Sequence, residues 1–278
     1  MVVHEPPPVG QKASEFVSLS EVAGNEVGQR NGVRLENRDD EDDGGVMLKA
    51  VAAISSRSVV FPLQIVLYIR KMLFLSMYRP SNQEQKKCIK KSGDFNYDTK
   101  FKGATALLLL SKTKELSDSS FLINHARVLV GSGLETFEKG KNALQNWRHF
   151  NLNWAFVDPK TPIQSGVKFC VCTKAVFPWL LMPLKVVYVD DSSKERNAVA
   201  SYSYGSGTLQ GHLLAGEECF SITMDEQNDV WYEILSISKP ANPLAFIGYP
   251  YVLLKQKHFA RESALAMQKH LSTKLDNK

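Results

Sequence analysis

Five strand-like runs follow one another with only short polar turns between them, and one long amphipathic helix comes after the last of them. The runs lie at residues 153–157, 167–176, 184–190, 200–224 and 230–238. The clearest turns are DDSS at 190–193 and DEQND at 225–229. Because parallel strands need crossover connections of about a dozen residues or more, this pattern predicts an antiparallel meander and not a series of βαβ units.

The final helix is predicted over residues 250–271, after the helix-breaking residues Pro240 and Pro243. Its apolar residues fall on one arc and its charged residues on the opposite side. The apolar set is Val252, Leu253, Phe259, Ala260, Ala264, Ala266, Met267 and Leu271. Such a helix needs an apolar partner, so we expect an α+β domain in which a curved antiparallel sheet grips the helix. A grip of this kind encloses a cavity between helix and sheet, a common place for small apolar molecules.

A strand and a helix are predicted upstream of the meander. The run FLINHARVLV at 121–130 is rich in apolar and β-branched residues and ends in Gly131-Ser132-Gly133, as a strand that leaves through a turn does. Residues 134–148 then place apolar side chains near helical spacing, although Gly140 weakens that helix by about 1 kcal/mol relative to alanine.

Residues 1–71 are predicted to be a disordered or weakly ordered extension, and residues 72–278 the folded domain. The extension contains the prolines at 6–8 and the acidic run at 39–43, and it shows no sustained apolar period. The whole chain has a net charge of +5 at pH 7, which divides into −2 for the extension and +7 for the domain. Because cleavable transit peptides avoid acidic residues, the extension does not resemble one.

The most apolar stretch, at 59–78, is interrupted by Pro62, Gln64 and the pair Arg70-Lys71. The short apolar segment at 59–69 is shorter than the roughly 20 apolar residues of a membrane-spanning helix. We therefore expect a short helix on or beside the domain. The alternative is an interfacial anchor with Arg70 and Lys71 at the lipid headgroups.

Composition and motifs exclude several function classes. The mild excess of basic residues is below what is usual for a protein that coats nucleic acid. Four cysteines without a secretory signal indicate a reducing compartment, and Cys170-x-Cys172 lacks the further ligands of a zinc site, so we interpret these thiols as buried and inert. The glycines at 205–211 are followed by a strand-like run and not a helix, which favours a hairpin or bulge over a phosphate loop. No hydrolase, metalloprotease or Walker motif is present, so we expect no catalytic residues, cofactor or metal.

Two groups of polar residues remain as binding candidates. The basic cluster KKCIKK at 86–91 suits anionic lipid or phosphate, but a solvated helix face is the commoner explanation. The second group is expected around the cavity: Tyr202, Tyr204, His212, Glu217, Glu218, Lys257 and Arg261. Because side chains alternate along a strand, the two glutamates point to opposite faces, and one of them can look inward to meet His212 or Arg261. The alternative is a structural ion pair that ties the sheet to the helix.

Three segments resemble an uncharacterised family of plant and bacterial proteins known as a domain of unknown function. They are GTLQGHLLAGEECF at 207–220, RVLVGSG at 127–133 and QKHFAR at 256–261, and the similarity covers roughly residues 72–271. The resemblance implies a helix-grip domain similar to the birch-allergen and START superfamily. Plant members of the family include an ion-conducting pore of the chloroplast outer envelope.

The resemblance thus implies an ion-conducting or transport-related protein associated with the chloroplast outer envelope, in contact with a lipid surface. A pore would require the chain to oligomerise. The alternative is a soluble helix-grip module, located in the cytoplasm, that binds a small apolar or amphipathic ligand. An enzyme that uses His212 with Glu217 or Glu218 is the least supported hypothesis.

Overall fold

The computed structural model of the protein describes residues 73–108, 120–175, 178–192 and 200–272. The predicted extension at 1–71, its apolar segment at 59–69 and the predicted domain boundary all lie outside the described residues. The last residues of the 59–78 stretch are described, and they differ from the expected helix: Phe74, Leu75 and Ser76 form a short strand. This strand pairs with a later one, and the backbone hydrogen bonds of that pairing outweigh the local preference.

The described elements follow one another in an order close to the predicted one. They are β1 (Phe74–Ser76), α3 (Asn82–Lys91), η2 (Thr99–Phe101), α4 (Ala104–Leu108), β2 (Leu122–Ser132), α6 (Leu134–Gln145), η3 (Arg148–Phe150), β3 (Ala155–Phe156), β4 (Lys168–Lys174), β5 (Trp179–Asp191), β6 (Ser201–Thr208), β7 (Leu214–Met224), β8 (Asp229–Pro240), α7 (Pro243–Ile247) and α8 (Tyr249–Ser272).

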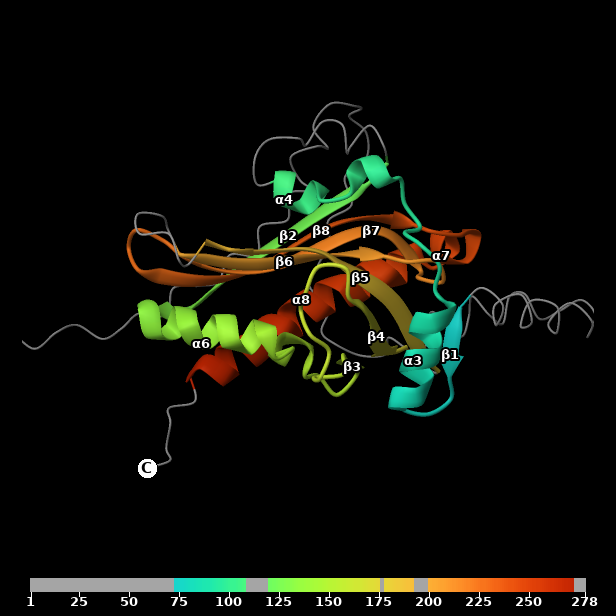
Figure 1. Ribbon diagram of the computed structural model, residues 1–278, viewed down its shortest axis with the longest axis horizontal. Helices are drawn as coiled ribbons and strands as arrows, with labels where there is room; N and C mark the ends of the chain where they lie inside the picture. Colours follow the sequence, from blue (N-terminus) through green and yellow to red (C-terminus); the bar gives the residue numbers. More distant parts are fainter. Residues whose placement is uncertain (1–72, 109–119, 176–177, 193–199, 273–278) are drawn as a thin grey trace, which may run out of the picture.

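All the described strands belong to one sheet, in the order β2-β8-β7-β6-β5-β4-β3, with β1 beside β5. Every pairing is antiparallel, so the predicted meander is confirmed. Register shifts at Leu129/Gly131 and at Val186/Tyr188 mark irregular places in the sheet. Irregularities of this kind bend strands and increase their twist. The result is a curved sheet with one concave and one convex face (Figure 1).

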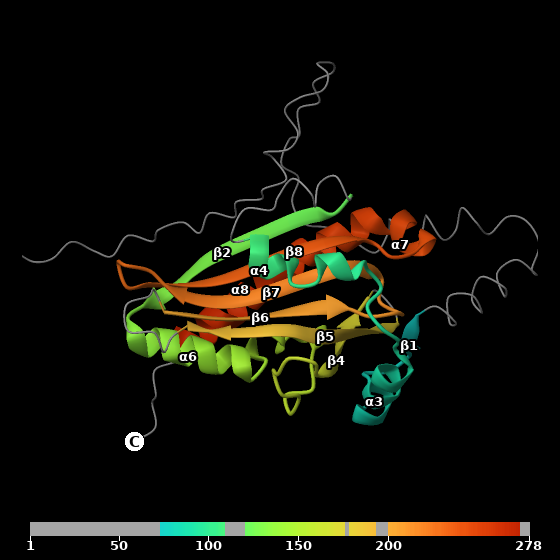
Figure 2. The same cartoon turned by 45° about the horizontal axis from the view of Figure 1, so that its top comes forward.

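The helices are divided between the two faces. Figures 1 and 2 show α6 and α8 under the concave face and α4 above the opposite face, with α3 and β1 at one end of the sheet. We call the concave side, which faces α8, the inner face, and the opposite side the outer face. The sheet therefore grips α8, and the helix-grip architecture expected from the sequence is present.

Helix α8 spans Tyr249–Ser272, within one residue of the predicted bounds. Its second half is fully packed, because Ser263, Ala264 and Met267 are buried. In its first half Val252 and Leu253 are only half-buried. The short helix α7 before it was not predicted. It begins at the cap Asn242, whose side chain accepts a hydrogen bond from the Ala245 amide, with Pro243 as its first residue.

The glycine-rich run at 205–211 lies in β6 and in the turn that leads to β7, so a hairpin is present and not a phosphate loop. On the outer face, a Cβ at Gly205 would lie 2.2 Å from the Tyr188 ring, and one at Gly207 would lie 2.3 Å from the Tyr97 hydroxyl. These two glycines therefore make room for aromatic side chains that cover the convex side of the sheet.

Candidate functional site

The inner face of the sheet changes from aromatic to polar between two neighbouring cross-strand rows. In the first row, Tyr204 of β6 stands opposite Phe220 of β7, which stands opposite Ile234 of β8. In the next row, the corresponding residues are Ser206, Glu218 and Ser236, and Asn124 of β2 completes it. We call Ser206, Glu218, Ser236 and Asn124 the polar row. It divides the interior of the grip into two ends of different chemistry.

The aromatic end is filled by side chains. His149 of η3 is buried, and its Nε2 atom lies 2.6 Å from the hydroxyl of Tyr204. Burial lowers the pKa of His149 to about 3, so its imidazole is neutral. Around it pack the rings of Trp147, Phe150 and Phe220. These buried side chains belong to the main hydrophobic core among the described residues.

The aromatic end is also closed by α8. The hydroxyls of Tyr232 and Ser263 lie 2.7 Å apart, and Met267 has no exposed surface. Phe259 packs against Phe150, with 4.8 Å between ring centroids. The second half of the helix is therefore fixed to the sheet by both polar and apolar contacts.

The polar row has an unsatisfied acid at its centre. Within the described segments, the Glu218 carboxyl group makes no hydrogen bond or ion pair, and burial raises its pKa to about 7. The hydroxyls of Ser206 and Ser236, which flank it on the adjacent strands, also have no hydrogen-bond partner in that part of the chain. Glu218 is half-buried, and the Nδ2 atom of Asn124 in the same row is buried without a partner. Because buried polar groups in proteins are nearly always hydrogen-bonded, this row is a candidate for contact with a bound molecule.

Helix α8 adds polar groups to the same end. The Gln256 amide nitrogen Nε2 lies 3.3 Å from the hydroxyl of Ser238, the next inner-face residue of β8 after Ser236. Its Oε1 atom is buried and has no partner among the described residues, and the same holds for Nδ2 of Asn124. Nε1 of Trp154 is a third buried atom of this kind. Helix α8, strand β2 and the residue before β3 thus each bring an unpaired polar atom to the interior.

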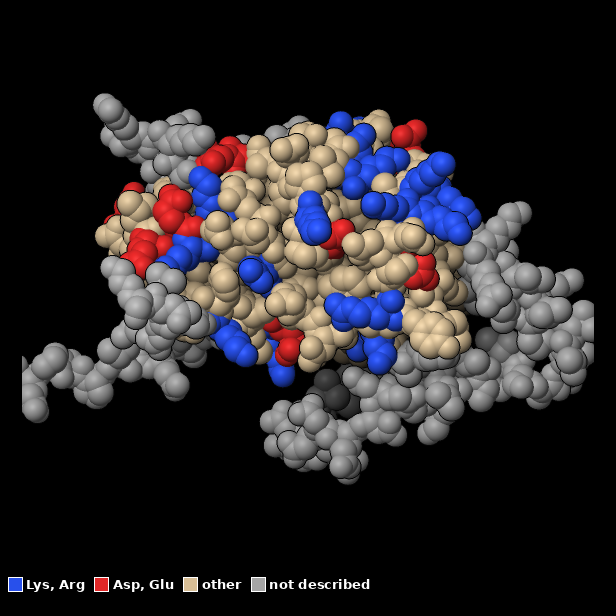
Figure 3. All heavy atoms as spheres, turned by 60° about the horizontal axis from the view of Figure 1, so that its bottom comes forward, with Lys and Arg blue, Asp and Glu red and all other residues tan. Residues whose placement is uncertain are grey.

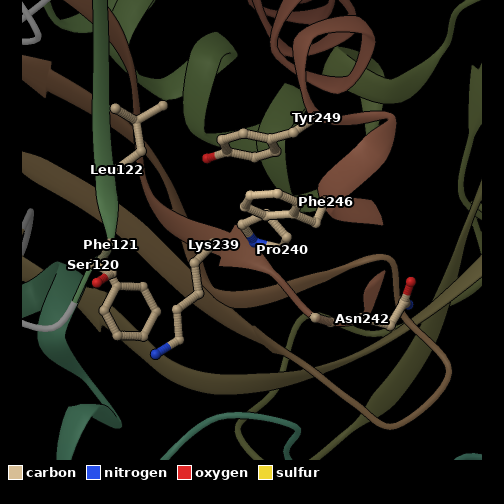
Figure 4. A pocket seen from close by; sticks show the side chains of 9 residues that line it. Ser120, Phe121, Leu122, Lys239, Pro240, Asn242, Phe246 and Tyr249 are labelled. Carbon is tan, nitrogen blue, oxygen red and sulfur yellow. The ribbon is translucent and has the colours of Figure 1, made fainter. Parts of the chain in front are cut away.

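A pocket opens beside this end, where β2, β8 and α7 meet. Its volume is about 630 Å³, and its walls are mostly apolar. Figure 4 shows the Phe246 and Tyr249 rings side by side, with the Tyr249 ring directed toward Leu122. Burial raises the pKa of Tyr249 and the nearby Ser238 side chain lowers it, so Tyr249 stands between this mouth pocket and the polar groups inside. The lining residues are Ser120, Phe121, Leu122, Lys239, Pro240, Ala241, Asn242, Phe246 and Tyr249.

Three of the seven residues predicted around the cavity face the interior of the grip. Tyr202 and Tyr204 lie on the inner face of β6, but both are in the packed aromatic end. Glu218 lies in the polar row. The sequence-based expectation that one of the two neighbouring glutamates points inward therefore holds for Glu218.

Glu217 points to the outer face, where the chain satisfies its carboxylate. Oε1 accepts hydrogen bonds from the Tyr97 hydroxyl at 2.6 Å and the Gly103 amide at 2.7 Å. Oε2 accepts from the amide and the hydroxyl of Thr105, at 3.4 and 3.3 Å. Glu217 therefore has a structural role: it holds residues 94–108 against the sheet. We call these residues the outer segment.

The remaining three predicted residues do not reach the interior, which differs from the expectation. His212 is buried in the β6–β7 turn, where burial lowers its pKa to about 4 and its Nδ1 atom accepts a hydrogen bond from the Leu214 amide at 2.9 Å. Lys257 and Arg261 are exposed on α8, and Arg261 lies beside Glu262 at 3.9 Å. The charged arc of the helix thus faces solvent, and the expected pairing of Glu218 with His212 or Arg261 is not formed.

Sequence reasoning missed Asn124, Ser206, Ser236 and Gln256. The available signal was the alternation of serine with apolar residues in 234–238 (ILSIS) and 201–206 (SYSYGS). Alternation along a strand places Ser206 on the face of Tyr202 and Tyr204, and Ser236 on the face of Ser238, but it does not show which face of the sheet is covered.

The other polar candidates have structural surroundings. The four exposed lysines of α3 lie on a helix capped by Ser81 and Glu84, and Figure 3 shows Lys and Arg side chains gathered at the end of the molecule that carries this helix. The four cysteines are free and buried, as expected. Hydrogen bonding to Cys172 and Cys88, together with burial, raises the pKa of Cys170, so the Cys170 thiol stays protonated.

Two kinds of feature are absent from the described segments. None of them contains three or more His, Cys, Asp or Glu side chains placed to hold a metal ion. Of the helices in the same segments, none combines the length and the apolar character that crossing a membrane requires.

Comparison with known sequences places the chain among uncharacterised proteins. A family model described as "Domain of unknown function (DUF1990)" matches residues 106–266. A UPF0548 protein of Arabidopsis thaliana is 59% identical over 203 residues, which cover 72% of this chain and 99% of the relative. UPF0548 proteins of Dictyostelium discoideum and Deinococcus radiodurans are 33% and 30% identical, over 54% and 50% of this chain and 73% and 72% of theirs.

Comparison with solved structures finds distant similarity. Ara h 8.0201 has a TM-score of 0.35 and 10% identity, over 55% of this chain and 99% of that one. Human STARD10 has a TM-score of 0.33 and 11% identity, over 54% and 62% of the two chains. A hypothetical protein of Helicobacter pylori has a TM-score of 0.34 and 15% identity, over 53% and 87%. Scores this low transfer neither a ligand nor an activity to this chain.

Proposed function

The chain belongs to the DUF1990 family, whose relatives in plants, amoebae and bacteria are named UPF0548 proteins, and we propose that it binds a small amphipathic molecule. The observation that carries this proposal is the polar row. It brings together a half-buried acid, two serine hydroxyls and an amide nitrogen that have no hydrogen-bond partner among the described residues. A bound molecule would supply the missing partners.

The mouth pocket gives the ligand a second, apolar environment. Phe121, Leu122, Pro240 and Phe246 line it, and Tyr249 connects it to Ser238 and so to the polar end. A ligand with a polar group at the row and an apolar part toward this pocket would satisfy both surfaces. The half-buried first half of α8 supports the same location, because the helix is less tightly packed there than around Met267.

Binding of the neutral dye Nile red to the full-length protein tests the proposal. We expect saturable fluorescence enhancement, and a retained molecule in native mass spectra of gently purified protein. Ser236→Leu, which fills the polar row, should weaken dye binding by about tenfold or more, a loss of about 1.4 kcal/mol. The matched control is Ser201→Leu, the same substitution at a half-buried position on the outer side of β6.

Two results would contradict this function. One is a wild-type protein that shows no saturable dye binding and is always empty in native mass spectra. The other is an equal loss of binding in the Ser236→Leu and Ser201→Leu variants, because the dye would then respond to general unfolding and not to this site.

The ion-conducting function and the chloroplast-envelope location implied by the resemblance stay predictions, since no contact among the described residues and no comparison bears on them. Purified protein in planar bilayers is the direct measurement: discrete conductance steps favour the pore, and electrically silent bilayers count against it. Fractionation of plant cells, with salt and carbonate extraction of membranes, measures the location.

A further inference from the structure

The polar row carries a negative group without a counter-charge. The Glu218 carboxyl group forms no ion pair within the described segments, and its raised pKa has burial as its cause. Ser206 and Ser236 stand directly opposite it on either side, at a Cβ separation of about 5 Å for such pairs. Each hydroxyl offers oxygen lone pairs to a donor.

Gln256 adds a fixed acceptor. Because its Nε2 atom is held by the Ser238 hydroxyl, its Oε1 atom points away from that bond, and this oxygen is buried without a partner. A carboxylate, two hydroxyls and an amide oxygen therefore converge on the same end of the grip. Nδ2 of Asn124 and Nε1 of Trp154 are unpaired donors in the interior, whereas the carboxylate and the Gln256 oxygen only accept and the two hydroxyls can also accept.

Aromatic rings border this group of acceptors. Phe220 is the next inner-face residue of β7 after Glu218, and the Tyr204 ring stacks on it with 5.5 Å between centroids. Phe259 of α8 meets Phe220 at 6.2 Å. Ring faces attract cations through their quadrupole, and the attraction grows when the cation is desolvated.

We propose that the open end of the grip binds an amphipathic amine, with the ammonium group at Glu218 and the apolar part directed toward the mouth pocket. This inference rests on the proposed binding function and names the class of its ligand. A primary ammonium has three N–H donors and no acceptor, which suits an acceptor-rich site. A carboxylate ligand would meet Glu218 as a like charge, and an alcohol would leave its negative charge uncompensated.

The pH dependence of ligand binding depends on Glu218 and on the other titratable groups near it. Tyr204 and Tyr232 have pKa values raised well above 10 by burial, and His149 has a pKa of about 3. His258 of α8 is exposed and stacks on Trp154. Lys255 of α8 lies over the Trp154 ring, and Lys239 lines the mouth pocket. Burial raises the pKa of Glu218 to about 7.

Calorimetric titration of the full-length protein with octylamine, octan-1-ol and octanoate tests the inference, because the three probes share one chain and differ in the head group. At pH 8 we expect octylammonium to bind about tenfold or more tightly than octan-1-ol, and octanoate to bind most weakly. Ammonium binding requires ionised Glu218, so the octylamine affinity should rise about tenfold from pH 6 to pH 8.

Glu218→Gln removes the charge and keeps the shape. It should abolish the preference for octylamine and its pH dependence, while the octan-1-ol affinity stays within about twofold. Retained alcohol binding also shows that the variant is folded. Glu262→Gln, which removes one acid from the other side of α8, is the matched control and should behave as the wild type.

The outcomes separate the two proposals. Binding of octan-1-ol as tightly as octylamine, or an unchanged amine preference in Glu218→Gln, overturns the amine assignment and leaves the binding function standing. Failure of all three probes to bind the wild-type protein overturns both.

Discussion

Glu217 and Glu218 are neighbours on β7, and the two faces of the sheet treat their carboxyl groups in opposite ways. On the outer face, the Glu217 carboxylate accepts hydrogen bonds from Tyr97, Gly103 and Thr105. On the inner face, the Glu218 carboxyl has no partner in the described segments, and its pKa is about 7. Glu217 is buried and Glu218 is half-buried, so the acid without a partner is also the one that the chain covers less completely.

The comparison separates a structural acid from a candidate binding acid. The outer segment folds over Glu217 and supplies backbone and side-chain donors, so burial of that carboxylate costs little. Helix α8 places Gln256 at Ser238 and Phe259 against Phe220, and neither side chain donates a hydrogen bond to Glu218. A buried polar group that the chain itself satisfies holds the fold together, whereas one left unsatisfied marks where another molecule can bind.

Replacement of the outer acid should have the largest effect. Glu217→Ala leaves a tyrosine hydroxyl and two backbone amides buried without an acceptor, each at a cost of about 1–3 kcal/mol. We expect the free energy of unfolding in urea to fall by about 4 kcal/mol, with increased hydrogen exchange in the outer segment. A loss below about 1 kcal/mol would show that this acid does not hold the segment.

Ionisation of the inner acid should have the next largest effect. The ordinary pKa of Glu218 is 4.5 and its folded value is about 7, so between these pH values the folded protein holds a proton that the unfolded chain has released. Stability contributed by this group is therefore full below pH 4.5 and is lost as the pH rises to 7, by as much as about 3 kcal/mol.

The variant Glu218→Gln isolates the contribution of Glu218 to the pH dependence of stability, because His149 and His212 titrate equally in both proteins. We expect the variant to gain stability relative to the wild type as the pH rises from 5 to 8, measured by urea unfolding at each pH. A difference that does not change with pH would mean that Glu218 is hydrated or paired in solution.

Two asparagines extend the comparison to neutral side chains, and their replacement should have the smallest effect on stability. Asn96 of the outer segment donates to the Leu214 carbonyl at 2.9 Å and accepts from the Thr208 hydroxyl at 2.5 Å. Asn124 of the polar row has an unpaired Nδ2 atom. We expect Asn96→Ala to lower the free energy of unfolding by about 2 kcal/mol, which thermal unfolding shows as a lower midpoint. Asn124→Leu should change the free energy of unfolding by less than about 0.5 kcal/mol. Equal losses would contradict the distinction between the two faces.

The fold was largely predictable from the chain downstream of Phe121. Short turns excluded parallel strands, and the apolar arc of 250–271 required a concave partner, so the meander and the gripped helix follow from local patterns. The elements that were missed depend on contacts distant in sequence. β1 exists only through its pairing with Leu180 and Leu181 of β5, and α7 is a single capped turn too short to have a period.

The site was predictable only in part. Tyr202, Tyr204 and Glu218 do face the interior, but the packing of His149 against Tyr204 closes the aromatic end. That contact joins residues 55 positions apart, so no local pattern shows it. Lys257 and Arg261 were expected at the cavity from their place on the helix edge, yet the rotation of α8 about its axis, set by Ala264 and Met267, leaves both in solvent.

The sequence by itself determined that Glu217 and Glu218 occupy opposite faces, because side chains alternate along any β-strand. It also determined that α8 buries one stripe, since the helical period gathers its apolar residues on one arc. Only the tertiary structure decided which acid is satisfied. The donors of Tyr97, Gly103 and Thr105 come from a segment more than a hundred residues away from Glu217. On the inner face, helix α8 brings no donor to Glu218. Hydrogen bonds require atoms within about 3 Å, and a linear pattern carries no information on such distances.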